Sequence, residues 1–198
     1  MRKIVKEIAQ LDKKFAPVID ASEICDIGTK NPERGHFESL VSTVISQQLA
    51  TAAARTIKVK FQIECGRITP KNVAKLDLLQ MRSAGLSGAK SKTIQGLAEA
   101  ALEKRVDFKN LHELDDETVY RDLTALWGIG PWTVDMFMMF QLGRLDIWPT
   151  GDLGVRRGWE RSHNLKEEIS PEQLAKKGEI FRPHRSIVAW YCWRVLDI

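Results

Sequence analysis

The amino-acid sequence predicts an all-α protein, because apolar residues recur at helical spacing and strand signals are absent. Ile4, Ile8 and Leu11 give the first example of this spacing, which returns along the 198-residue chain. No alternating run of Val, Ile and Thr occurs, and neither does an Asn-Gly or Asp-Gly hairpin turn. At 43% hydrophobic residues, the chain can bury one sizeable core or two smaller ones.

The same spacing sets the expected helices. Asp115 or Asp116 is suited to cap one of them, and the residues from Ser170 to Gln173 read as a capping box with proline in the first turn. The last helix follows Pro183. The expected ranges are 4–15, 37–45, 52–63, 77–84, 89–104, 115–126, 131–142, 152–159, one starting at 170, and 184–196.

Two short segments, 32–35 and 148–151, are the expected seams between lobes. They divide the chain into a lobe of residues 36–147 and a second lobe of residues 1–35 plus 148–198. No low-complexity linker separates them. We therefore expect two helical lobes within a single functional unit, 1–198.

The composition excludes several classes. No run of 18 apolar residues occurs, and the first residues lack a signal-peptide pattern, so we expect a cytoplasmic protein. Cys25, Cys65 and Cys192 are far apart, which argues against a zinc site, an iron–sulfur cluster or a disulfide framework. The net charge is +4, and Lys and Arg concentrate between Thr51 and Asn110. A nucleic-acid partner and an ordinary solvated surface both fit this distribution.

Residues 126–133, LWGIGPWT, carry the first chemical signal. A Gly-x-Gly turn between helices lets backbone N–H groups approach an anion, and the next helix adds its positive end. The candidate phosphate-binding residues are Gly128, Ile129, Gly130, Trp132 and Thr133. Such a hairpin would grip DNA without reading its sequence. An ordinary corner between two helices is the alternative.

A second segment, residues 149–157 (PTGDLGVRR), follows the hairpin. Together with residues 36–49 and 182–186, these segments resemble the helix-hairpin-helix (HhH-GPD) DNA glycosylase superfamily, and within it the 3-methyladenine DNA glycosylase II branch. The resemblance covers about residues 36 to 190. It implies two helical lobes with a DNA cleft between them, and an enzyme of base excision repair that flips damaged bases out of the duplex.

Asp152 matches the catalytic aspartate of that family. Breaking an N-glycosidic bond builds positive charge on the sugar, and a carboxylate stabilises that charge. A helix cap is the alternative role, and the two roles are compatible. Trp132 stands where bifunctional members carry a nucleophilic lysine, so the resemblance implies a monofunctional enzyme without lyase activity. The closely spaced cysteines of the iron–sulfur branch are absent.

The resemblance also implies a base pocket, a wedge and an ion site. Trp132 and Met136 match pocket positions, and plain core packing is their alternative. His184 occupies the place of a pocket tryptophan, where a group that hydrogen-bonds a base edge and a simple surface residue are the two readings. Gln48, with Gln47 beside it, matches the wedge that fills the gap left by the flipped base, and a buried glutamine pair is its alternative. A monovalent cation, Na⁺ or K⁺, would bind the backbone carbonyls of Thr124, Leu126 and Gly128. Lysines in the turn at 86–92 could meet further phosphates.

We therefore expect a monomeric enzyme that removes alkylated bases of the 3-methyladenine type from double-stranded DNA, with no required cofactor and no membrane association. If the source is a bacterium or an archaeon, it would be associated with the nucleoid. Two alternatives stay open. One is a glycosylase for uracil, hypoxanthine, ethenoadenine or mismatched bases. The other is a non-catalytic DNA-binding protein that uses the same hairpin.

Overall fold

The computed structural model describes residues 1–29 and 33–197, and their regular elements are all helical. The predicted all-α class is therefore confirmed for this part of the chain. The chain forms two compact units, Met1–Asn31 with Met138–Ile198, and Pro32–Phe137. We refer to them as the terminal unit and the central unit and describe each by itself.

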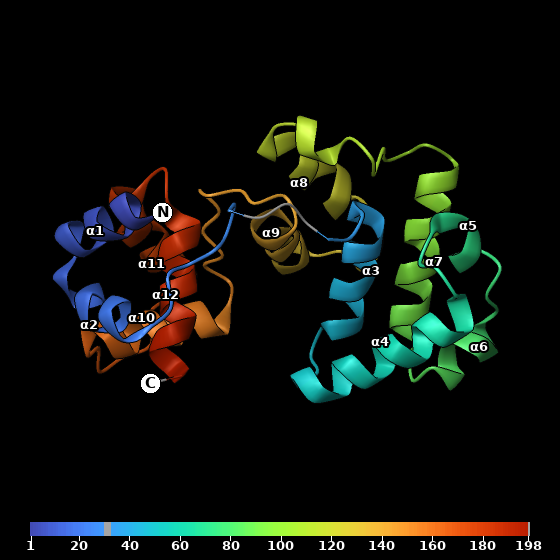
Figure 1. The fold of residues 1–198 in the computed structure, drawn as a ribbon, viewed down its shortest axis with the longest axis horizontal. Coiled ribbons are helices and arrows are strands. Elements are labelled where there is room, and N and C mark those ends of the chain that lie inside the picture. Colours follow the sequence, from blue (N-terminus) through green and yellow to red (C-terminus); the bar gives the residue numbers. More distant parts are fainter. Residues whose placement is uncertain (30–32, 198) are drawn as a thin grey trace. The chain divides into compact units, whose positions relative to one another are not determined.

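The terminal unit gathers helices from both ends of the chain (Figure 1). Its first helix is shorter than the predicted range of 4–15, because Asp12 is extended and its side chain accepts a hydrogen bond from the Lys14 N–H. Phe15 consequently lies in a 3₁₀ turn and is fully buried. The helices are α1 (Arg2–Leu11), α2 (Ala16–Ala21), α10 (Leu153–His163), α11 (Pro171–Gly178) and α12 (Arg185–Asp197), with 3₁₀ turns η1 (Lys13–Phe15) and η3 (Glu179–Phe181).

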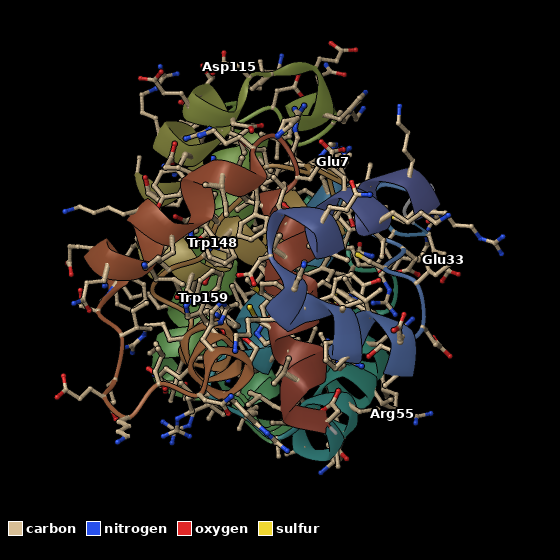
Figure 2. The ribbon with its side chains drawn as sticks, turned by 90° about the vertical axis from the view of Figure 1, so that its left-hand side faces the viewer. Glu7, Glu33, Arg55, Asp115, Trp148 and Trp159 are labelled. Carbon is tan, nitrogen blue, oxygen red and sulfur yellow. The ribbon has the colours of Figure 1, made fainter. Side chains whose placement is uncertain are left out.

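Aromatic side chains form the core of this unit. Phe15 packs edge-on against Trp159 and Phe181 at ring-centroid distances of 5.7 and 5.9 Å. Trp148 packs against Trp159 at 6.1 Å (Figure 2). His163 stacks on Trp159 at 4.1 Å and approaches the Asp12 carboxylate at 2.8 Å, so the N-terminal segment is tied to α10.

Helices α10 and α12 pack closely because α10 carries glycines one turn apart. A β-carbon on Gly158 would overlap the backbone carbonyl of Cys192, and one on Gly154 would lie 2.7 Å from Trp193. This close approach brings the start of α10 against the C-terminal half of α12. The start of α10 is the segment that holds Asp152.

The central unit is built around α3 and α7. The buried side chains of α3 include Leu40, Val44 and Ile45, and α7 contributes Ile94 and Leu97. The structure also contains a short helix, α5, that the sequence pattern did not predict. The helices are α3 (His36–Ser46), α4 (Thr51–Cys65), α5 (Pro70–Val73), α6 (Leu78–Ser83), α7 (Gly88–Leu102) and α8 (Asp116–Thr124), with a 3₁₀ turn η2 (Leu111–Glu113), followed by most of α9 (Pro131–Phe140) (Figure 1).

The predicted helix starts are confirmed where polar caps set them. The Asp115 carboxylate accepts the Thr118 N–H at 2.8 Å, and Ser170 and Gln173 form the expected capping box. The division between the units falls before Met138, within α9, and thus earlier than the expected seam at 148–151. Met138 is buried, and its carbonyl accepts the Arg144 N–H at 2.9 Å, which fastens the end of α9 to the segment that follows. Pro32, in the other expected seam, lies outside the described residues.

Candidate active site and nucleic-acid interface

Asp152 is the N-cap of α10 and is half-buried. A turn precedes it, in which its N–H donates to the Pro149 carbonyl at 2.9 Å. Its Oδ1 accepts two hydrogen bonds of 2.8 Å, one from the Val155 N–H and one from the Trp193 indole N–H. The capping role is confirmed, and the same bonds orient the carboxylate that the sequence assigns to catalysis.

The stretch around His184 fastens the segment that leads to Asp152. The Arg185 guanidinium pairs with the Asp146 carboxylate through bonds of 2.7 and 3.0 Å. The Ser186 hydroxyl accepts the Ile147 N–H at 2.8 Å and donates to the Arg144 carbonyl at 2.8 Å. His184 itself is half-buried just before α12, and its N–H donates to the Phe181 carbonyl. The sequence match in this stretch therefore includes residues that anchor the chain as well as the candidate pocket residue.

The two glycines of the hairpin have different roles. Gly128 has φ +79°, and a β-carbon there would collide with the Thr93 hydroxyl of α7. A β-carbon on Gly130 would meet nothing within 4 Å. Gly128 therefore closes the turn against α7, whereas Gly130 leaves open space at the N-terminal end of α9. An anion could use that space.

The candidate hairpin side chains are unequally accessible. Ile129 and Thr133 are 4% and 2% exposed, so their side chains are closed to a ligand. Their N–H groups already donate to the carbonyls of Leu126 and Gly130, at 3.1 and 3.0 Å. Trp132 is 38% exposed. Trp127 is 53% exposed, and the Lys92 ammonium lies 4.2 Å from the centre of its ring. This second tryptophan and its lysine extend the accessible surface of the hairpin.

Thr124, Leu126 and Gly128, the candidate cation ligands, belong to the lining of one open hollow of about 500 Å³ formed by residues 124–130. Their donors would be neutral backbone carbonyls, which suit a hard monovalent cation. The Leu126 carbonyl accepts the Ile129 N–H and keeps a second lone pair for an ion. The residues present therefore fit the expected ion.

The candidate wedge lies where α3 ends. Gln48 has φ +56° and is exposed, and Gln47 is half-buried with its amide donating to the Thr133 hydroxyl at 2.8 Å. The Lys90 ammonium donates to the carbonyls of Ile45 and Gln47 at 2.8 and 2.7 Å. Burial lowers the pKa of Lys90. This ammonium therefore holds the backbone at the end of α3, and contact between the lysines of this turn and a phosphate stays a prediction.

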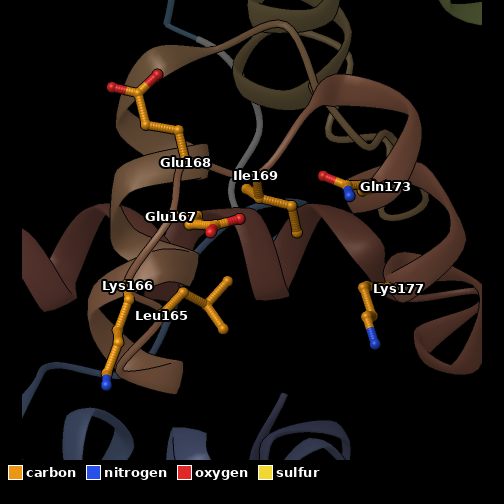
Figure 3. A pocket seen from close by; sticks show the side chains of 7 residues that line it. All are labelled: Leu165, Lys166, Glu167, Glu168, Ile169, Gln173 and Lys177. Carbon is orange, nitrogen blue, oxygen red and sulfur yellow. The ribbon is translucent and has the colours of Figure 1, made fainter.

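The candidate pocket residues fall in both units. Trp132 and the half-buried Met136 lie one turn apart on the part of α9 that belongs to the central unit, and His184 belongs to the terminal unit with Asp152. Their assembly into one pocket stays a prediction. A separate hollow of about 400 Å³ in the terminal unit is lined by residues 165–169 with Gln173 and Lys177 (Figure 3), and it contains none of the predicted site residues.

Two further findings concern the whole described part of the chain. Within residues 1–29 and 33–197, no helix is long and apolar enough to cross a membrane, and no group of three or more His, Cys, Asp or Glu side chains could hold a metal. The three cysteines are buried free thiols. Burial raises the pKa of Cys25 to about 11, which disfavours the reactive thiolate.

Comparison with known proteins establishes the family. Residues 41–183 match the family described as "HhH-GPD superfamily base excision DNA repair protein". The chain therefore belongs to the HhH-GPD superfamily of base excision DNA repair proteins.

Two relatives from one yeast carry the names of a DNA glycosidase-like protein and a DNA glycosylase. The chain is 30% identical to the "Alkylbase DNA glycosidase-like protein mag2" of Schizosaccharomyces pombe, covering 96% of this chain and 91% of the relative. It is 33% identical to DNA-3-methyladenine glycosylase 1 of the same organism, covering 85% and 78%.

Solved structures give the same result. The fold matches the S. pombe 3-methyladenine DNA glycosylase Mag1, solved in complex with abasic DNA, with a TM-score of 0.89 at 28% identity over 99% of this chain and 97% of that chain. It also matches a DNA-3-methyladenine glycosidase from Bacillus halodurans, with a TM-score of 0.80 at 31% identity over 96% and 87%. The predicted superfamily and the predicted class of enzyme, a DNA glycosylase, are confirmed.

Proposed function

We propose that this protein is a monofunctional DNA glycosylase that hydrolyses the N-glycosidic bond of alkylated bases, of the 3-methyladenine type, in double-stranded DNA. The observation that carries the proposal is the Asp152 carboxylate, fixed at the start of α10 by two N–H donors. Supporting it, similarity to proteins named for 3-methyladenine extends over most of the chain. A protein that only binds DNA would use this carboxylate for no more than the cap of α10.

Asp152 supplies the charge that the reaction needs. As the bond between the sugar and the base breaks, its electron pair leaves with the base and positive charge develops on the sugar. A carboxylate close to the sugar stabilises this charge. Water then adds its oxygen to the sugar carbon and loses a proton, which leaves an abasic site and the free base. A base methylated at a ring nitrogen already carries positive charge and leaves as a neutral molecule, so no strong general acid is required.

The other candidate residues would bind and select the DNA. Trp132 and Met136 would line the base pocket, where an aromatic face attracts a cationic base. His184 would contribute a group able to hydrogen-bond a base edge. Gln48 would fill the gap in the duplex, and Gln47 would support it through Thr133.

The hairpin would position the duplex through its phosphates. Gly130 leaves space at the N-terminal end of α9, where the backbone N–H groups and the helix dipole favour an anion. Na⁺ or K⁺ bound to the carbonyls of Thr124, Leu126 and Gly128 would add positive charge beside that phosphate. No other cofactor is needed for hydrolysis, and we propose that the enzyme acts as a monomer.

The enzyme would not cleave the DNA strand. Strand cleavage of this kind requires an amine that forms a covalent adduct with the sugar, and Trp132 occupies that position of the hairpin. We expect abasic sites that break only after alkali treatment. Borohydride trapping of a protein–DNA adduct in appreciable yield would contradict this.

The test is a panel of duplexes that each carry one lesion. The panel contains 3-methyladenine, 7-methylguanine, hypoxanthine, ethenoadenine, uracil and a mismatch, and products are cut with alkali. We expect the fastest excision for the cationic methylated purines. Faster release of the neutral lesions would assign the enzyme to another substrate class, and no release from any duplex would contradict the proposed function.

A further inference from the structure

The Trp193 side chain meets the catalytic carboxylate from a different helix. Trp193 lies on α12, and its indole N–H donates to Asp152 Oδ1 at 2.8 Å. The Val155 N–H, at the start of α10, reaches the same oxygen at 2.8 Å. Donors from two helices therefore converge on one oxygen atom, which restrains the carboxylate more than a helix cap alone.

The neighbouring residues keep the indole in place. A β-carbon on Gly154 would lie 2.7 Å from Cδ1 and 2.9 Å from Nε1 of Trp193, and 3.1 Å from Asp152 Oδ1. The Phe140 ring stacks on the indole at a centroid distance of 5.8 Å and an interplanar angle of 30°. Gly154 thus provides the space for the indole to reach Asp152, and Phe140 limits its movement.

From this geometry we propose that Trp193 is a positioning residue, which holds the Asp152 carboxylate in the orientation that stabilises the charge on the sugar. The inference rests on the proposed function, because it assigns the catalytic charge to Asp152. The physical basis is preorganisation: a carboxylate that is already oriented needs no reorientation as the charge develops. Hydrogen bonds to an ionised acceptor are short and strong, so one indole N–H can contribute substantially to this restraint.

The first test compares Trp193→Phe with Trp190→Phe. Phenylalanine at 193 removes the donor and keeps an aromatic ring against Phe140. Trp190 is a matched control, because it is a half-buried tryptophan on the same helix that packs against Tyr191 at 5.0 Å. We expect Trp193→Phe to lower the single-turnover excision rate about 10- to 100-fold. Its affinity for an abasic-site duplex should stay within a few-fold of the wild type, and Trp190→Phe should excise at the wild-type rate.

A double-mutant cycle separates positioning from general destabilisation. If Trp193 acts through Asp152, adding Trp193→Phe to Asp152→Asn causes no further loss of rate. Gly154→Ala, which intrudes on the indole from α10, should lower the rate in the same way. An additional loss in the double variant equal to that of Trp193→Phe alone would overturn the proposal. So would wild-type excision by a folded Trp193→Phe protein whose Asp152→Asn counterpart is inactive.

An NMR measurement tests the contact without requiring activity. The indole N–H resonance of Trp193, assigned by its loss in Trp193→Phe, should move upfield in Asp152→Asn, because the charged acceptor is lost. The Trp190 indole resonance should stay in place. An unchanged Trp193 resonance would overturn the proposal even if the enzyme excises bases. The shift without excision from any duplex would support the contact and contradict the proposed function.

Discussion

Asp152 lies at the start of α10 and Gln48 lies just after the end of α3, but the protein restrains different parts of these two residues. Asp152, in the terminal unit, itself accepts hydrogen bonds from α10 and α12. Gln48, in the central unit, is exposed, and the bonds are made by its neighbours: Gln47 reaches Thr133, and Lys90 binds the carbonyls of Ile45 and Gln47.

The difference corresponds to the two proposed roles. A group that stabilises charge works best when its own atoms are fixed before the reaction. A wedge must enter the DNA, so its backbone is held while its side chain stays accessible. The protein therefore restrains the side chain at one site and the supporting backbone at the other.

The largest effect on the central unit is expected at Gly128. Gly128→Ala should lower the free energy of unfolding by about 3 kcal/mol, because its φ of +79° disfavours a β-carbon that would also collide with Thr93. Thermal melting measures this loss of stability.

Gly130→Val is the matched variant, with affinity for DNA measured by titration, since open space surrounds that position. It should fold normally and bind plain duplex several-fold more weakly. Unchanged affinity in the folded Gly130→Val protein would mean that the hairpin only connects two helices and does not bind a DNA phosphate.

The next effect concerns the wedge side chain. Gln48→Gly should slow excision of a well-paired lesion about tenfold and that of a mismatched lesion less, because filling the gap matters most when flipping is costly. Glycine suits this test better than alanine, since φ at this position is +56°. Gln48→Asn, which keeps an amide and tolerates this backbone, is the control and should retain more activity. Equal losses of excision rate on both substrates would mean that Gln48 does not act as the wedge.

A smaller effect is expected from Lys90, which supports the backbone before Gln48, the proposed wedge. Lys90→Met removes both ammonium–carbonyl bonds and should slow excision a few-fold while raising hydrogen exchange of the backbone after Ser46. Lys92→Met is the control, because Lys92 lies over Trp127 instead. It should leave hydrogen exchange at the end of α3 unchanged. Equal exchange in the two variants would mean that Lys90 does not restrain the loop.

Much of the fold could be predicted from the sequence, because its signals are local. The Asp115 cap and the Ser170 capping box act within one turn of the chain, and both are found in the structure. The break at Asp12 was missed, because the apolar spacing from Ile4 to Phe15 continues across it. There, a bond from the Lys14 N–H to the Asp12 side chain competes with the helix.

The candidate site was predicted less completely, because its supporting contacts are distant in sequence. Asp152 and the hairpin follow family motifs, but Trp193 lies 41 positions from the carboxylate it contacts, and Lys90 lies 43 positions from Gln47. Contacts between residues this far apart in the sequence do not produce a local sequence motif. Two small residues one turn apart, the glycines at 154 and 158, are a sequence signal of the close helix packing that brings Trp193 to Asp152.

The most direct measurement is single-turnover excision by Asp152→Asn on a duplex with a 3-methyladenine-type lesion, together with its affinity for an abasic-site duplex. Asparagine keeps the shape of the side chain and its ability to accept the Val155 and Trp193 bonds, but it removes the charge. We expect base release to fall at least about 100-fold, with DNA affinity within a few-fold of the wild type. Excision near the wild-type rate by this variant would contradict the assignment of catalysis to Asp152.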